Sequence, residues 1–175
     1  MKVVVINGSA RKGNTLCAIN AFIEGAKDNN EIEIIEAHTL NLKACMGCDA
    51  CANSKGCVAL DDTNETVDKI VNADMILFAS PVYWWGITGQ MKLLIDKCYS
   101  KGNFLRGKKI GVIAIGADAL TGIQYELIRK QFECIAAYLS WEILFNKSYS
   151  AGEKNDLAKQ EKAIAELKKL GESIN

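Results

Sequence analysis

The stretch that decides the fold reads Lys2-Val3-Val4-Val5-Ile6-Asn7-Gly8-Ser9-Ala10-Arg11-Lys12-Gly13-Asn14-Thr15. Its β-branched run up to Ile6 is typical of a strand that is buried on both faces of a sheet. Asn7-Gly8-Ser9 ends that run and predicts a turn. Apolar residues then recur at helical spacing from Leu16 to Ala26. The segment therefore predicts a strand, a turn and a helix in immediate succession.

The rest of the chain repeats this alternation. Further strands are expected over residues 31–37, 75–79, 109–115 and 141–146, and further helices over 61–72, 88–99, 121–139 and 153–171. Strict alternation implies right-handed crossovers and a parallel sheet with helices on both faces. Five strands suit the doubly wound order 2-1-3-4-5, in which ligands bind where the order reverses. We expect a single domain over residues 1–175, because a hydrophobic fraction of 49% is enough to fill one core.

The turn after the first strand has the composition of an anion site. Glycines let backbone N–H groups converge, the helix N-terminus adds positive potential, and Arg11 can bind a phosphate bidentately. The loop lacks the Walker and dinucleotide-binding spacings, so a terminal phosphate monoester fits better than a triphosphate or a pyrophosphate. A solvated turn with a good helix cap is the alternative. The candidate phosphate-binding residues are Ser9, Arg11, Gly13, Asn14 and Thr15.

Three consecutive aromatic residues follow the third strand, in the segment Ser80-Pro81-Val82-Tyr83-Trp84-Trp85-Gly86. Three aromatics in a row cannot all point into one core, so some of them must line a surface or a cleft. A flat ligand with a π face is one occupant, and contact with the adjacent helix or with another subunit is the alternative. In the expected sheet order this loop lies beside the phosphate loop, so together they would hold the ring and the phosphate of one ligand.

Four of the seven cysteines are close together in the sequence, with the spacing Cys45-x2-Cys48-x2-Cys51-x5-Cys57. This compact spacing suits a [4Fe-4S] cluster better than zinc, because structural zinc sites use two C-x2-C pairs separated by a long spacer. A loop of thiols without metal and a zinc site stay open as alternatives. The remaining cysteines lie on apolar-patterned segments and are expected to pack in the core; they are Cys17, Cys98 and Cys134.

Composition excludes several classes of partner. The 21 basic and 21 acidic residues cancel, so there is no electrostatic case for a nucleic-acid or membrane partner. No apolar run approaches the roughly 18 to 20 residues of a membrane span. The N-terminus has no signal-peptide pattern, so we expect a cytoplasmic protein with reduced cysteines.

Asp61 and Asp62 are expected to cap a helix rather than form a catalytic pair, because adjacent acids at a helix start complement its dipole.

Three motifs taken together resemble one family. They are N-G-S-A-R-x-x-N-T after the first strand, C-x-G-C-x-x-C-x5-C-x3-D-D in the middle and S-P-V-Y-W at the third strand. As a set they resemble the flavodoxin-like NAD(P)H-dependent FMN reductases and their iron-sulfur flavoprotein relatives. The resemblance covers the chain well up to about residue 100. It implies a flavodoxin-like three-layer α/β sandwich that binds FMN, and typically a homodimer or higher homo-oligomer with the flavin near the interface.

The resemblance also implies which residues contact FMN. The phosphate would lie on Ser9, Arg11, Asn14 and Thr15, and the isoalloxazine ring against Pro81, Val82, Tyr83, Trp84, Trp85 and Gly86. Gly116 and Ala117, after the fourth strand, would close the site. At that loop the sequence departs from the glycine-rich form common in the family.

The leading hypothesis from the sequence is an oxidoreductase. A hydride from NAD(P)H would reach the flavin, and the electrons would pass to a small-molecule acceptor such as flavin or quinone, or to a redox protein. Because the cofactor carries this chemistry, no side chain is named as a general acid or base. The alternative is an electron-transfer module in which a [4Fe-4S] cluster and FMN relay electrons with little use of NAD(P)H.

Overall fold

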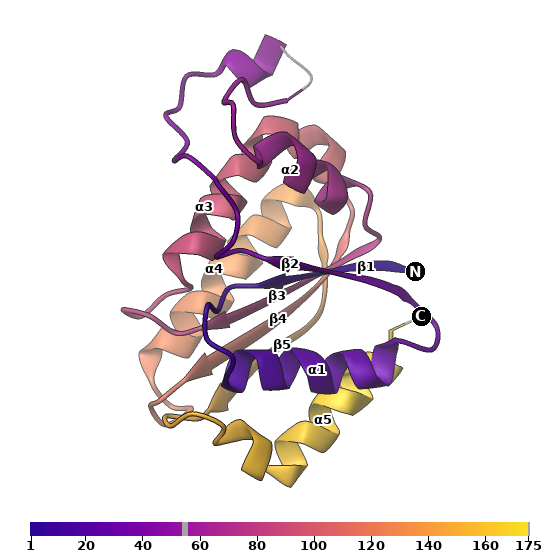
Figure 1. Cartoon of the computed structure of the whole chain (residues 1–175), viewed down its shortest axis with the longest axis vertical. Coiled ribbons are helices and arrows are strands. Elements are labelled where there is room, and N and C mark those ends of the chain that lie inside the picture. Colours follow the sequence, from indigo (N-terminus) through magenta and orange to yellow (C-terminus); the bar gives the residue numbers. More distant parts are fainter. Residues whose placement is uncertain (54–55, 175) are drawn as a thin grey trace.

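The structure is a computed structural model that describes residues 1–53 and 56–174. Five strands form one parallel sheet in the order β2-β1-β3-β4-β5 (Figure 1). The strands are β1 Lys2–Asn7, β2 Glu31–Glu36, β3 Met75–Pro81, β4 Lys109–Gly116 and β5 Glu142–Ser150. The predicted flavodoxin-like architecture and its strand order are therefore confirmed.

Helices cover both faces of the sheet (Figure 1). The α-helices are α1 Asn14–Ala26, α2 Thr63–Val71, α3 Gly89–Lys97, α4 Ile123–Leu139 and α5 Glu161–Glu172. The 3-10 helices are η1 Ala50–Asn53, η2 Cys98–Leu105 and η3 Leu157–Lys159. Helices α1 and α5 lie on one face, and α2, α3 and α4 lie on the other (Figure 1). Within residues 1–53 and 56–174, none of the helices combines the length and the apolar character needed to cross a membrane.

The apolar residues of β1 contribute side chains to two separate cores, one on each face of the sheet. Val3 and Val5 pack with α1 and α5, whereas Val4 and Ile6 pack with the opposite helical layer. This division follows from the strand geometry, in which successive side chains point to opposite faces. Strand β2 lies at the sheet edge, and charged residues alternate with apolar ones along it.

Two predicted boundaries near the C-terminus were wrong. Strand β5 runs four residues further than 141–146 and ends at Ser150, because it pairs with β4 as far as Gly116. Helix α5 begins at Glu161 and not at residue 153. The intervening segment is held as a loop by hydrogen bonds from distant residues, which local periodicity does not record. Cys134, predicted to lie in the core, is exposed on α4.

Candidate functional site

Three loops leave the carboxyl ends of β1, β3 and β4 at the same edge of the sheet, away from the N-terminus (Figure 1). The first two are tied directly together. The Gly8 amide donates to the Ala79 carbonyl at 2.8 Å, and the Thr88 hydroxyl donates to the Gly8 carbonyl at 2.8 Å. A Cβ at Gly8 would lie 3.0 Å from Thr88 Oγ1, a tight contact that glycine avoids. The phosphate loop and the aromatic loop therefore lie side by side.

The phosphate loop is shaped by its own polar groups. Asn7 Oδ1 accepts from the Ser9 amide at 3.0 Å, and Asn7 Nδ2 donates to Glu36 at 2.8 Å. The Ser9 hydroxyl accepts from the Arg11 amide at 3.1 Å, which folds the loop over itself. The Arg11 side chain is exposed and has no ion-pair partner within the described part of the chain. Its guanidinium is thus free to bind an anion from outside.

The Asn14 side chain makes long-range hydrogen bonds that the sequence did not predict. Its Nδ2 donates to the carbonyls of Ala151 at 3.1 Å and Glu153 at 2.9 Å, and its Oδ1 accepts from the Leu157 amide at 3.1 Å. The side chain therefore fastens the β5–α5 connection to the start of α1.

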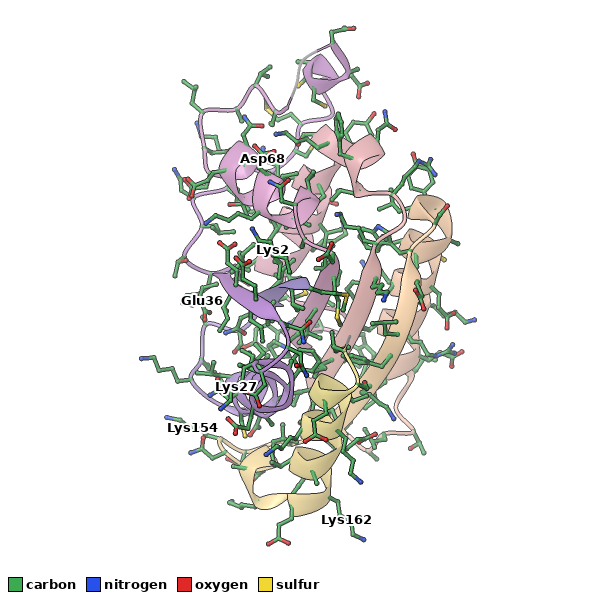
Figure 2. All side chains as sticks on the ribbon, turned by 90° about the vertical axis from the view of Figure 1, so that its right-hand side faces the viewer. Lys2, Lys27, Glu36, Asp68, Lys154 and Lys162 are labelled. Atoms are coloured by element: carbon green, nitrogen blue, oxygen red, sulfur yellow. The ribbon has the colours of Figure 1, made fainter. Side chains whose placement is uncertain are left out.

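This connection brings Lys154 against the loop, with its Cγ 3.9 Å from where a Gly13 Cβ would lie. Figure 2 shows Lys154 projecting outward from the connection. Sequence reasoning missed this second cation, because no local pattern links it to residues near position 13. Thr15, also among the candidates, is buried at the beginning of α1.

The aromatic loop is a tight two-residue turn. Tyr83 and Gly86 exchange hydrogen bonds of 2.9 and 3.0 Å between their amides and carbonyls. Trp84 and Trp85 both have positive φ, 46° and 61°, as in a type I′ turn. Bulky residues rarely adopt this conformation, and it costs of order 1 kcal/mol or more for each of them. The turn leaves Trp84 92% exposed and Trp85 53% exposed.

Strain of this kind collects at functional sites, where the surroundings hold it in place. Here the base of the turn is held on both sides. The Val82 amide donates to the Ile115 carbonyl at 2.8 Å, and the Thr88 amide donates to the Ser80 hydroxyl at 3.0 Å. The exposed indoles are therefore held on a fixed backbone at the carboxyl edge of the sheet.

The third loop follows β4. The Ala151 amide donates to the Gly116 carbonyl at 2.8 Å, and the Tyr125 hydroxyl donates to the Asp118 carbonyl at 2.8 Å. A Cβ at Gly116 would lie 2.7 Å from the Tyr125 hydroxyl, so Tyr125 packing requires glycine there. Ala117 follows at the same edge, exposed to solvent. All three predicted loops are thus brought to one edge of the sheet.

The cysteine-bearing segment rises away from the sheet between β2 and α2 (Figure 1). Its neck is closed by two carboxylates. Asp61 Oδ2 accepts from the Lys43 amide at 2.9 Å, and Asp62 Oδ2 accepts from the Asn41 amide at 2.7 Å. Asp61 Oδ1 also accepts from the Thr63 amide at 3.0 Å at the start of α2, whereas the side chain of Asp62, the N-cap residue, makes no capping hydrogen bond. The acidic pair therefore closes a loop as well as beginning a helix.

Cys57 lies where this loop meets α3. Lys97 Nζ lies 3.3 Å from Asp61 Oδ2 and 3.5 Å from Cys57 Sγ, and the Ala59 amide donates to the same sulfur at 3.5 Å. The Lys97 and Asp61 side chains are only 3% and 0% exposed. Burial by itself would raise the pKa of Asp61, but hydrogen bonds from Thr63, the Lys43 amide and Lys97 outweigh it and lower the pKa to about 2.

The other cysteines of the loop are less constrained. Cys45 and Cys48 are exposed, and Cys51 is partly buried. Four thiols in one closed loop match a [4Fe-4S] cluster in kind and number of donors. In residues 1–53 and 56–174, however, no three His, Cys, Asp or Glu side chains are placed to hold a metal ion. The cysteine ligand set therefore stays a prediction.

Known proteins resemble the chain in both sequence and structure. The chain matches the family described as NADPH-dependent FMN reductase over residues 1–139. An iron-sulfur flavoprotein of Methanocaldococcus jannaschii is 36% identical over 122 residues, which is 67% of this chain and 63% of that protein. An iron-sulfur flavoprotein of Methanosarcina thermophila is 32% identical over 133 residues, which is 74% of this chain and 70% of that protein.

A solved structure agrees in fold. An NAD(P)H:quinone oxidoreductase from Methanothermobacter marburgensis superimposes with a TM-score of 0.77 at 15% identity, covering 98% of this chain and 96% of that one. The sheet order, the phosphate-type loop and the family match agree with one another. The chain belongs to the NADPH-dependent FMN reductase family.

Proposed function

We propose that residues 1–175 act as one FMN-binding domain of an NAD(P)H-dependent oxidoreductase that reduces flavin, quinone or a similar acceptor. The observation that carries this proposal is that the phosphate loop lies beside the aromatic segment, because Gly8 is hydrogen-bonded to Ala79 before that segment and to Thr88 after it. One loop offers a free cation and the other exposed π surfaces. FMN, when bound, supplies the two-electron chemistry.

The chain's own contribution is binding, orientation and exclusion of water. The α1 N-terminus, Arg11 and Lys154 would hold the dianionic phosphate, because a helix start offers backbone amides and Lys154 lies beside Gly13 next to it. Ser9 and Asn14 support this cradle from behind through their hydrogen bonds to the backbone. Gly13 leaves room beside Lys154.

The flat ring would lie against the segment Pro81–Gly86. The turn holds its backbone rigid, so binding a ring there would order few new side chains. Gly116 and Ala117 lie at the same edge and would flank the ring. Placing the ring among aromatic side chains excludes water from one of its faces.

FMN titration tests the phosphate cradle. Binding of FMN should quench its fluorescence with one site per chain, and Arg11→Gln and Lys154→Gln should each weaken FMN binding about tenfold, the loss expected for a charge-assisted hydrogen bond. Riboflavin, which lacks the phosphate, should bind these variants as it binds the unchanged protein. Lys162→Gln, an exposed lysine on α5 (Figure 2), is the matched control. Equal losses for FMN and riboflavin would contradict the phosphate role.

The nicotinamide step needs its own experiment. Anaerobic stopped-flow mixing of the FMN-loaded protein with NADH or NADPH should bleach the flavin absorbance rapidly. Indifference to both nucleotides would favour an electron-transfer module instead. The four-cysteine loop supports that second candidate, in which [4Fe-4S] and FMN relay electrons. Iron and labile-sulfide assays on anaerobically purified protein separate the two, and stoichiometric zinc or no metal would count against the relay.

The remaining proposals concern partners and location. A small-molecule acceptor or a redox protein would take the electrons, and a homodimer or higher homo-oligomer would cover part of the exposed Trp84 surface. All seven cysteines are free thiols, which suits a cytoplasmic location. Sedimentation velocity of the FMN-loaded protein tests the oligomer.

A further inference from the structure

A cavity of about 650 Å³ opens between η2 and α4, on the face of the sheet that carries α3. Phe78, Phe132 and Trp141 line its inner part. Leu105 and Trp141, which also line it, precede β4 and β5, so the cavity lies toward the amino ends of these strands. The candidate flavin site lies at their carboxyl ends. The cavity is therefore a separate site, and its volume falls within the roughly 300 to 1,000 Å³ of small-molecule pockets.

The cavity is aromatic from its floor to its rim. At the floor, the Phe78 ring centroid lies 4.9 Å from that of Phe132 and 6.0 Å from that of Trp141. At the rim, three large aromatic side chains are between 61% and 72% exposed; they are Tyr99, Phe104 and Tyr138. Exposed aromatics gathered around a hollow that reaches the core are a typical lining for a planar apolar ligand.

The polar groups of the cavity leave one positive charge without a counterion. Asp96 in the lining pairs with Lys92 at 2.5 Å, and Lys101 pairs with Asp68. Arg106, by contrast, makes no ion pair within residues 1–53 and 56–174. Its guanidinium lies 5.9 Å from the Tyr138 ring centroid and donates to the Tyr138 carbonyl at 3.4 Å.

Two further groups define the lining. The Ser100 hydroxyl is buried and has no hydrogen-bond partner in the described part of the chain. An unpaired buried hydroxyl is unfavourable, but the Ser100 oxygen is not accessible from the cavity and is therefore not a ligand contact. Burial raises the pKa of the nearby Cys98 thiol to about 12, so this side chain stays neutral and adds no negative charge.

We propose that this cavity binds a small aromatic anion, such as an aryl carboxylate or sulfonate. The ring would lie among Phe104, Tyr138 and Trp141, and the anionic group would pair with Arg106. Arg106 selects the charge, because its five N–H donors match a planar or tetrahedral oxyanion and have no carboxylate partner at present. The aromatic walls select the ring.

The probe is 8-anilinonaphthalene-1-sulfonate, an aromatic anion whose fluorescence rises on binding. It is titrated into the full chain in the presence of excess FMN. We expect one saturable site per chain, and Arg106→Gln and Phe104→Ala should each weaken binding about tenfold. Both residues are exposed, so these changes leave the core intact. Arg129→Gln is the matched control, because Arg129 lies on α4 but does not line the cavity. This variant should bind the sulfonate as the unchanged protein does.

The neutral analogue N-phenyl-1-naphthylamine separates charge from shape. It should bind the unchanged protein and Arg106→Gln alike, but should be weakened by Phe104→Ala. The proposal is overturned if sulfonate binding is unsaturable, or is insensitive to both variants. Release of FMN by the probe would assign the binding to the flavin site, and altered sedimentation of Phe104→Ala would show that a second copy covers the rim. Flavin absorbance reports FMN occupancy separately, so a failure to bind FMN leaves this test unaffected.

Discussion

Asp61 is a single carboxylate that joins three separate parts of the chain. It accepts hydrogen bonds from the Lys43 and Thr63 amides and pairs with Lys97, which also contacts Cys57. The neck of the cysteine loop, the start of α2 and the end of α3 therefore meet on one buried side chain. Such a residue is expected to matter more than any exposed ion pair, because a buried charge without its partners is strongly destabilising.

Acid sensitivity follows from the pKa of Asp61. In the folded chain it is about 2, below the ordinary 3.8, so the unfolded chain binds this proton more readily. The stabilisation is therefore complete above pH about 4, and about 2 kcal/mol is lost as the pH falls toward 2. In urea unfolding, the free-energy gap between the unchanged protein and Asp61→Asn should shrink from about pH 6 to about pH 2.5. Asp28→Asn, at an exposed site, should show no gap, and a gap independent of pH would contradict this assignment.

At the scale of the element, the aromatic turn has a strained backbone that lowers stability and leaves both indoles exposed. Two tryptophans occupy positions that a type I′ turn normally gives to Asn and Gly. The turn exists because its flanks are tied to β4 and to the start of α3, and not because its own residues favour it. The local propensity and the tertiary frame disagree here, which is typical of a functional segment.

Replacing the two tryptophans by better turn formers should therefore stabilise the fold and weaken FMN binding. Trp84→Asn combined with Trp85→Gly should raise the free energy of unfolding by about 1 to 2 kcal/mol, because the left-handed strain is relieved. The same variant should bind FMN more weakly, because two π surfaces are lost. Urea unfolding and FMN fluorescence quenching measure the two effects. Weaker folding together with weaker binding would show that the indoles contribute to stability.

The pair of helices α1 and α5 depends on two glycines. A Cβ at Gly171 would lie 2.1 Å from the Phe22 carbonyl oxygen, and one at Gly25 would lie 2.0 Å from the Lys168 carbonyl oxygen. The helices thus touch through their backbones, and no side chain fits between them.

Gly171→Ala should accordingly destabilise the protein by about 3 kcal/mol or more, because the backbone of α1 cannot move aside without disturbing the core. The matched control is Gly89→Ala in the first turn of α3, where a Cβ meets no heavy atom within 4 Å. That change should leave stability unaltered or raise it by up to about 1 kcal/mol. Thermal unfolding of both variants tests the contrast, and equal melting temperatures would refute the close contact.

At the scale of the whole molecule, the cysteine loop is an addition to a complete sandwich. The sheet and both helical layers pack around two apolar cores, and neither core includes any of the described loop residues 44–53 and 56–60. The neck is already closed by hydrogen bonds at Lys43 and Asp61. Removing the loop should therefore expose almost no apolar surface.

A deletion tests this independence. Replacing residues 44–60 by a short Gly-Ser linker, which can span the closed neck, should change the free energy of unfolding by less than about 1 kcal/mol. FMN binding should persist, because the predicted flavin contacts lie outside the loop, whereas any bound iron should be lost. Urea unfolding, flavin titration and an iron assay measure the three effects. A loss of several kcal/mol would show that the loop is part of the core.

Local pattern was enough to predict most of the architecture. The β-branched run of β1, the alternation that followed and the apolar periodicity of α1 predicted the strands and helices, because neighbouring residues carry the periodicity of burial. The sheet order came from analogy with known doubly wound sheets, and the structure confirms it. The predicted adjacency of the phosphate loop and the aromatic loop also followed from that order. Boundaries failed where long-range pairing decided them, as at the end of β5.

The sequence by itself determined the fold family, the edge of the sheet at which the three candidate loops meet, and the residue types gathered there. Only the tertiary structure decided how those residues are used. Asn14 is hydrogen-bonded to the β5–α5 connection that carries Lys154, and Trp84 has a left-handed backbone conformation. The neck of the cysteine loop is hydrogen-bonded to Asp61. The physical reason is distance along the chain: Asn14 and Leu157 are 143 residues apart, and no periodicity within a helix or a strand encodes such a contact.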